Sequence, residues 1–175
     1  MKIALGADHA GYLYKDQIAK MLQSQGHEIL DFGACDATPV DYPQYGYVVG
    51  EAVATGQADR GIVVCGSSIG IAIAANKVPG VRCAVVTEPL SAELSRRHND
   101  ANVLALSERL TGWEMIERIV QVFLDSPFDG DAPSGKRHAH RVEQLFQFTD
   151  AQRERTLKAL ESGEVNDAQT PKDLL

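Results

Sequence analysis

Short apolar runs alternate with longer amphipathic stretches along most of this chain. Five of the runs suit buried strands, and each is followed by helical spacing of apolar residues or by helix-capping signals. Strand–helix alternation of this kind predicts an α/β fold, a Rossmann-like three-layer αβα sandwich around a five-stranded parallel sheet. The expected strands are residues 2–7, 27–32, 61–65, 81–86 and 102–106, and the expected helices are residues 11–25, 45–55, 71–77, 89–97 and 111 to about 124.

The composition changes near residue 126. Residues 126–135 are rich in Pro, Gly, Asp and Ser and are interpreted as a linker. Residues 138–161 have a mostly helical pattern, in which Thr149 and Gln152 would form a capping box for a second helix. We expect one domain over residues 1–146 and a C-terminal helical extension over 147–175, frayed at its end.

Charge and cysteine content narrow the function classes. The 175 residues include 17 Lys plus Arg against 24 Asp plus Glu, a net charge of −7, which disfavours general binding to nucleic acid or to an anionic membrane. The sequence has neither a signal-peptide pattern nor an apolar run long enough for a transmembrane helix. Three cysteines without CxxC spacing favour the reducing cytoplasm over a disulfide framework.

The segment from Cys65 to Gly70 carries the strongest chemical signal. It reads Cys-Gly-Ser-Ser-Ile-Gly between an expected strand and an expected helix, so its backbone N–H groups can face an anion. A thiolate is favoured beside such a helix start, and Cys65 is a candidate base or nucleophile. The alternative is a buried core cysteine followed by a tight turn, as we expect for Cys35 and Cys83. The segment does not fit a P-loop, and Gly6 and Gly11 do not form the dinucleotide-binding fingerprint.

Two further polar groups flank expected helices. Asp8 and His9 end the first strand, where a carboxylate can bind sugar hydroxyls and an imidazole can bind phosphate or move protons. The alternative for Asp8 is the N-cap of the first helix. His98 and Asn99 close the fourth helix, where an exposed polar cluster is also typical of a solvated helix end.

Basic residues recur at Arg109 and in residues 136–141. Arg137 and Arg141 are four residues apart, so a helix places both guanidinium groups on one face, where they can bind a phosphate. The alternative is a solvated basic face. His138 and His140 have a spacing that directs them to different faces of a helix, so we expect no metal site there.

Six motifs, in this order, resemble the type B ribose-5-phosphate isomerases within the ribose- and galactose-6-phosphate isomerase family. The resemblance runs from Ile3 to about Leu145. The motifs occupy residues 6–11 (GADHAG), 41–43 (DYP), 65–70 (CGSSIG), 74–77 (AANK), 95–103 (SRRHNDANV) and 137–141 (RHxxR).

The resemblance implies a cofactor-free, metal-free aldose–ketose isomerase for a phosphosugar. It implies a homodimer or tetramer, joined in part by the C-terminal helix of the domain, with each active site shared between subunits. Its catalytic residues would be Cys65 as the base, His98 opening the sugar ring and Ser67 stabilising the enediolate. The substrate-binding residues would be Asp8, His9, Tyr42, Gly66, Ser68, Gly70, Asn99, Arg109, Arg137 and Arg141.

Three departures refine this expectation. One branch of the family uses a Glu where this chain has Ile71, which leaves Cys65 as the candidate base of the segment. Galactose-6-phosphate isomerase subunits usually lack the pair found here at His98 and Asn99, so the sequence favours a pentose phosphate. Ser67 replaces a common Thr and retains the hydroxyl. A tetrose phosphate, a hexose 6-phosphate or a non-catalytic α/β binding domain stay as alternatives.

Overall fold

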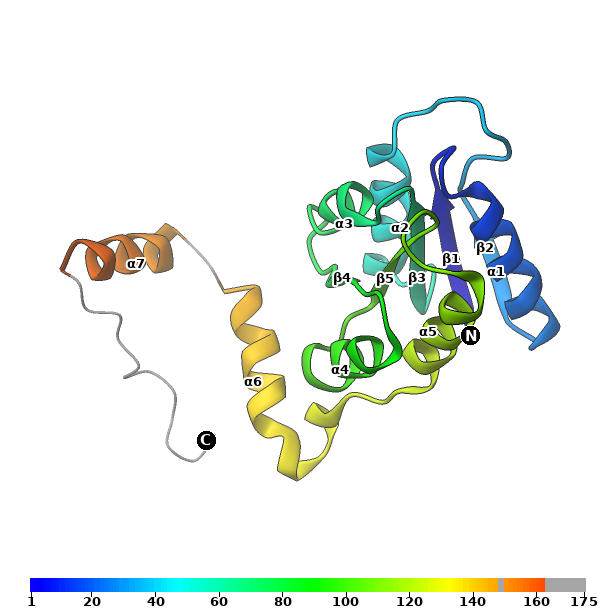
Figure 1. The fold of residues 1–175 in the computed structure, drawn as a ribbon. Helices are drawn as coiled ribbons and strands as arrows, with labels where there is room; N and C mark the ends of the chain where they lie inside the picture. Colours follow the sequence, from blue (N-terminus) through cyan, green and yellow to red (C-terminus); the bar gives the residue numbers. More distant parts are fainter. Residues whose placement is uncertain (148–149, 163–175) are drawn as a thin grey trace. The chain divides into compact units, whose positions relative to one another are not determined.

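All five strands lie in one parallel sheet, as the alternation predicts. The computed structural model describes residues 1–147 and 150–162 and orders the strands β2-β1-β3-β5-β4 (Figure 1). The strands are β1 (Lys2–Ala7), β2 (Glu28–Asp31), β3 (Arg60–Cys65), β4 (Cys83–Val85) and β5 (Val103–Ser107). The runs expected at 27–32 and 81–86 are shorter than predicted, and both belong to the edge strands of the sheet, which pair on one side only.

Helices cover both faces of the sheet. The first unit contains α1 (Tyr12–Ser24), α2 (Pro43–Ala54), α3 (Ile69–Ala75), α4 (Pro89–Asn99) and α5 (Trp113–Asp125). Side chains of α1, α4 and α5 pack on one sheet face, around Leu5, Leu104 and Phe123. Side chains of α2 and α3 pack on the other, around Val49, Val63 and Ile71. The three-layer prediction is therefore confirmed.

The connections follow from right-handed crossovers in a parallel sheet. The chain moves from β1 outward to β2 through α1 and then back past β1 to β3 through α2. Because the direction reverses, right-handed crossovers place α1 and α2 on opposite faces. The carboxyl ends of β1 and β3 consequently flank a topological switch point, where open α/β sheets bind ligands.

Two helix starts differ from what the sequence suggests. Thr111 and Glu114 have the spacing of a capping box, but they do not form one, because Gly112 is the N-cap of α5 and the buried Thr111 Oγ1 has no hydrogen-bond partner among the described residues. The helix expected to begin at Ile71 begins at Ile69, with Ser68 as its N-cap. The expected small-residue loop is therefore shorter, and Gly70 belongs to the first turn of α3.

The chain forms two compact units, Met1–Pro127 and Phe128–Leu175. The second contains the 3₁₀ turns η1 (Asp129–Asp131) and η2 (Pro133–Gly135), followed by α6 (Lys136–Leu145) and α7 (Asp150–Ser162). The second helix that the sequence predicts near residue 149 is therefore present as α7. Thr149 of the expected capping box and the segment 163–175 lie outside the described residues. Among the described helices, none has the length and apolar character needed to cross a bilayer.

Candidate active site

A cavity of about 700 Å³ opens at the carboxyl ends of β1, β3 and β5. Its walls come from the loops that follow these strands and from the residues flanking the starts of α2 and α3. Most of the site residues predicted in the first unit line it. The lining residues are Asp8, His9, Ala10, Tyr42, Cys65, Gly66, Ser67, Ile69, Gly70, Arg109 and Leu110.

Cys65 is the last residue of β3 and reaches the cavity from the sheet. Its side chain is only 4% exposed and packs with residues of the α2/α3 face. A thiol in this position can meet a ligand in the cavity while bulk water is largely excluded. Cys83 differs: it lies in edge strand β4, and burial raises the pKa of its thiol to about 12. Cys83 is therefore protonated at neutral pH, in agreement with a structural role. The expectation of a buried core cysteine is wrong for Cys35, which is exposed.

The short loop after Cys65 has an unusual backbone. Ser67 is exposed at the cavity, whereas Ser68 is 1% exposed and has a φ of 65°, in the left-handed region. A non-glycine residue in this region costs on the order of 1–3 kcal/mol and is typical of functional loops. Ser68 is not among the residues that line the cavity, and its hydroxyl donates to the carbonyl of Ser67. Any ligand contact of Ser68 would therefore come from its backbone.

The loop after β5 is hydrogen-bonded to the end of β3. The N–H of Glu108 donates to the carbonyl of Cys65 at 3.1 Å, and the N–H of Arg109 donates to the carbonyl of Gly66 at 3.2 Å. These bonds continue the parallel register in which Cys65 pairs with Ser107. They hold Arg109 beside the Cys65 loop and place a guanidinium in the cavity wall.

Glu108 is a supporting residue that the sequence did not indicate. Its carboxylate accepts the backbone N–H of Tyr14 at 3.1 Å, in the first turn of α1. Carboxylates stabilise helix N-termini in this way. Glu108 therefore ties the β5–α5 loop to α1 as well as to β3, across 94 residues of sequence.

Asp8 and His9 lie at the end of β1. The Asp8 carboxylate accepts the N–H of Ala10 at 2.9 Å, and Gly11 is the N-cap of α1, so the interpretation of Asp8 as the N-cap is wrong. His9 Nδ1 lies 3.2 Å from the backbone nitrogen of Val40 and 3.3 Å from the Val40 carbonyl oxygen. When the Val40 N–H donates to Nδ1, the neutral His9 ring carries its proton on Nε2. That tautomer offers an N–H donor to an anion.

Tyr42 covers Gly70 at the opposite wall of the cavity. A Cβ on Gly70 would lie 2.7 Å from Tyr42 Cζ and 3.0 Å from its hydroxyl oxygen. Only glycine allows this approach of an aromatic ring to the first turn of α3. Tyr42 and Gly70 are thus brought together as predicted.

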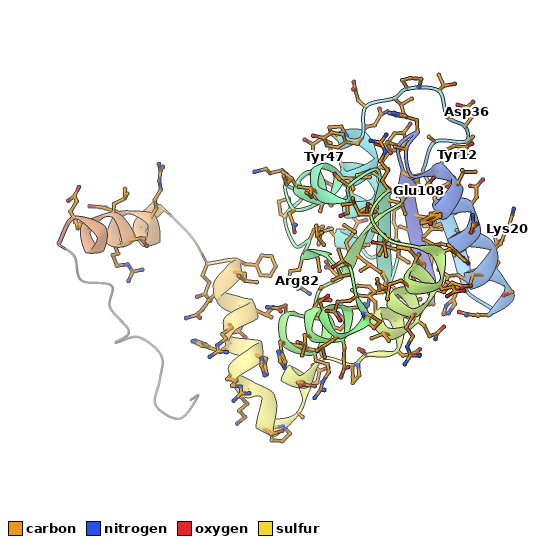
Figure 2. All side chains as sticks on the ribbon, in the orientation of Figure 1. Tyr12, Lys20, Asp36, Tyr47, Arg82 and Glu108 are labelled. Atoms are coloured by element: carbon orange, nitrogen blue, oxygen red, sulfur yellow. The ribbon has the colours of Figure 1, made fainter. Side chains whose placement is uncertain are left out.

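His98 and Asn99 lie on the side of the sheet where the strands begin, opposite the carboxyl ends that form the cavity. Helix α4 runs from the carboxyl end of β4 back to the amino end of β5, so its last residues are far from Cys65. Asp100, which follows them, pairs with Arg82 just before β4 (2.6 Å) and with the buried Arg96 (2.6 Å). Strand β3 has six residues, and at about 3.3 Å per residue the two edges are roughly 20 Å apart. Within one chain, His98 does not reach the cavity. Figure 2 labels Arg82, which pairs with Asp100 just after α4, and Glu108, which follows β5.

Arg137 and Arg141 belong to the second unit. Both are exposed on α6, four residues apart, so they share a helix face as predicted. The Nε of Arg137 lies 3.3 Å from Nε2 of His138. Arg137 and Arg141 therefore form a basic face of α6.

Comparison with known proteins gives one consistent family. Residues 3–145 match the family described as Ribose/Galactose Isomerase. Ribose-5-phosphate isomerase B of Escherichia coli K12 is 44% identical over 144 residues, covering 82% of this chain and 93% of that protein. Galactose-6-phosphate isomerase subunit LacB of Clostridium acetobutylicum is 39% identical, covering 73% and 74%.

A solved structure agrees with the sequence matches. The structure of Clostridium thermocellum ribose-5-phosphate isomerase B superposes with a TM-score of 0.81 at 49% identity, covering 85% of this chain and 97% of that chain. The fold and the matched length of this chain agree with that structure. The chain is therefore a member of the ribose/galactose isomerase family.

Proposed function

We propose that this protein is a cofactor-free isomerase that interconverts D-ribose 5-phosphate and D-ribulose 5-phosphate through a cis-enediol. The observation that carries the proposal is the composition of one cavity wall: the Cys65 thiol, the loop that follows it, and the basic side chains of Arg109 and His9. A base, donors for a negative oxygen and a phosphate-binding group are the requirements of this reaction.

The chemistry proceeds on the open-chain sugar. The Cys65 thiolate removes the proton from C2 of the aldose, the electron pair forms the C1–C2 double bond, and the carbonyl oxygen at C1 becomes negative. Ser67 and the loop N–H groups stabilise that enediolate. Transfer of the proton from Cys65 to C1, with exchange of a proton between O1 and O2, gives the ketose. Binding of the phosphate by His9 and Arg109 orients the reacting carbons.

The active site is shared between two copies of the chain in this proposal. Ring opening is assigned to His98, with Asn99 beside it, and these residues lie at the opposite sheet edge from the Cys65 of their own chain. A second copy would supply both residues, and the basic face of Arg137 and Arg141 on α6 would complete the phosphate site. The family resemblance supports this division. The free cysteines Cys35, Cys65 and Cys83 suit the reducing cytoplasm in which we place the enzyme.

The decisive experiment measures turnover of ribose 5-phosphate with a chelator present. Wild type should isomerise the sugar, and Cys65→Ala should lose activity while keeping its fold. Cys83→Ala is the matched control, because it removes a partly buried thiol elsewhere in the sheet. Near-wild-type turnover of Cys65→Ala would remove the base assignment.

A hexose 6-phosphate is the second candidate substrate, because a relative named as a galactose-6-phosphate isomerase subunit is 39% identical. A panel of tetrose 4-phosphate, ribose 5-phosphate, allose 6-phosphate and galactose 6-phosphate, ranked by kcat/KM, separates these substrates. Tight nucleotide binding without turnover of any of them would instead indicate a non-catalytic domain.

A further inference from the structure

Ser107 is a buried polar residue beside the proposed base. It is the last residue of β5, it pairs in register with Cys65, and it is 1% exposed. Its hydroxyl donates to the carbonyl of Gly66 at 2.6 Å and accepts the N–H of Leu110 at 3.0 Å. Ser107 does not line the cavity, so any effect on the reaction must pass through these partners.

The Gly66 carbonyl has two donors on the same side. It accepts from the Ser107 hydroxyl and, at 3.2 Å, from the N–H of Arg109. Because a trans peptide is planar, the N–H of Ser67 points opposite to the carbonyl of Gly66. The two bonds that hold this carbonyl toward the β5–α5 loop therefore direct the Ser67 N–H away from that loop.

The loop does not fix this orientation by itself. Gly66 has no side chain, so rotation about its backbone is less restricted than for any other residue. A rotated Gly66–Ser67 peptide would exchange the positions of the N–H and the carbonyl oxygen. A carbonyl oxygen facing a negative enediolate would repel it, whereas the N–H would stabilise it.

We propose that Ser107 is a positioning residue for the isomerisation: its hydroxyl locks the Gly66–Ser67 peptide so that the Ser67 N–H serves the developing enediolate. The inference rests on the proposed function and adds to it a residue that does not touch the substrate. It requires that loss of the hydroxyl weaken binding of the enediolate more than binding of the ground state.

The test uses an isosteric pair, Ser107→Thr and Ser107→Val, with Ser107→Ala as a smaller variant. Thr keeps the hydroxyl and Val removes it at nearly the same volume, so packing effects of the extra methyl group are common to both. For each variant, kcat and KM for ribose 5-phosphate are measured. Two inhibition constants are added: one for a hydroxamate that mimics the planar anionic enediolate, and one for ribitol 5-phosphate, which carries the phosphate but no such group.

The expected result is a selective loss. Ser107→Val and Ser107→Ala should lower kcat roughly 10- to 100-fold, because the Arg109 N–H still holds the carbonyl; outright loss of an oxyanion donor costs roughly 100- to 1000-fold. Their inhibition constants for the hydroxamate should rise by a similar factor, while those for ribitol 5-phosphate and KM stay within twofold. Ser107→Thr should retain activity closer to wild type.

Other results would overturn the inference. If hydroxyl-free variants that melt cooperatively keep wild-type kcat, or if both inhibitors weaken equally, Ser107 has only a structural role. Those outcomes leave the proposed function intact, because wild type still isomerises the sugar. Absence of turnover in wild type would overturn both proposals.

Discussion

The guanidinium of Arg109 lies directly against the α-carbon of Gly66: a Cβ at that glycine would stand 3.1 Å from both Cζ and Nε of Arg109. Gly66→Ala should therefore push the Arg109 guanidinium a few tenths of an ångström out of its position in the cavity wall. We expect KM for the phosphosugar to rise about tenfold, the order of one lost charge-assisted hydrogen bond. Steady-state kinetics and competition by inorganic phosphate measure the effect.

Gly112→Ala is the control for this substitution. Gly112 has an ordinary φ of −70°, and a Cβ there meets no atom within 4 Å. Its kinetics should match wild type. An unchanged KM in Gly66→Ala would mean that Arg109 does not bind the substrate from its observed position.

The opposite placement of Cys65 and His98 predicts complementation between inactive chains. Cys65→Ala and His98→Ala are each expected to be inactive as pure proteins. In a mixed dimer, the site that uses Cys65 of the first variant and His98 of the second contains both lesions. The other site uses the intact Cys65 and the intact His98 and contains neither lesion. Random assortment restores about a quarter of wild-type activity, since half the dimers are mixed and each has one intact site. Activity is measured after the two proteins are unfolded together and refolded.

A second mixture controls for this result. Cys65 and Arg109 line the cavity of the same chain, so Cys65→Ala mixed with Arg109→Ala leaves a lesion in every site. That mixture should show no gain beyond the sum of its components. Equal recovery in both mixtures, or none in the first, would contradict a site shared in the proposed way.

The raised pKa of Cys83 predicts selective alkylation. With a pKa of about 12, roughly 10⁻⁴ of this thiol is ionised at pH 8, and the thiolate is the reactive form. Iodoacetamide should modify the exposed Cys35 rapidly and spare Cys83 until the protein is unfolded. Peptide mass spectrometry over time gives each rate, and modification of Cys83 at the rate of Cys35 in folded protein would show that this edge of the sheet opens freely.

Arg96 should be a major determinant of stability. Its side chain is 3% exposed, donates to the Asp100 carboxylate at 2.6 Å and the Ala101 carbonyl at 2.7 Å, and lies 5.8 Å from the Phe123 ring centre. Asp100 is 30% exposed and would keep its pair with Arg82, so Arg96→Ala should cost the buried hydrogen bonds and packing of the guanidinium, roughly 2 kcal/mol of the free energy of unfolding. Urea denaturation measures the change.

Arg97→Ala is the comparison for Arg96→Ala. Arg97 pairs with Glu93 at 2.8 Å, but both side chains are about 40% exposed (42% and 38%), and exposed pairs contribute about 1 kcal/mol or less. The two adjacent arginines should therefore differ clearly in their effect. Equal losses would mean that the Arg96 network adds nothing beyond surface charge.

The sheet and most of the cavity follow from local sequence pattern. Five apolar runs predict five strands, and polar residues at the ends of the central runs predict where the cavity opens. The position of His98 also follows from the strand–helix alternation, because a helix that connects two parallel strands must end near the amino end of the second strand. The bounds of α3 do not follow, since its N-cap Ser68 adopts a left-handed conformation that its residue type does not favour.

The features that local sequence patterns do not predict depend on contacts between segments that are distant in the sequence. Glu108 accepts the N–H of Tyr14 across 94 residues, which no local pattern indicates. Lys15 is similar: as a lysine it is expected to be exposed, yet only 2% of its side chain is accessible. Burial acts to lower the pKa of Lys15, but its bonds to Asp31 and Asp16 outweigh burial and raise it. Such pairs become visible only when the chain is folded.

The position of α4 has a genetic consequence. If the site is shared as proposed, a subunit with a lesion at Cys65 would still offer an intact His98 to its neighbour, and the reverse would also hold. In a cell that expresses mutant and normal alleles together, each lesion therefore disables only the sites to which it contributes. Activity should fall in linear proportion to the mutant fraction, so such alleles should be recessive and two different ones can compensate for each other.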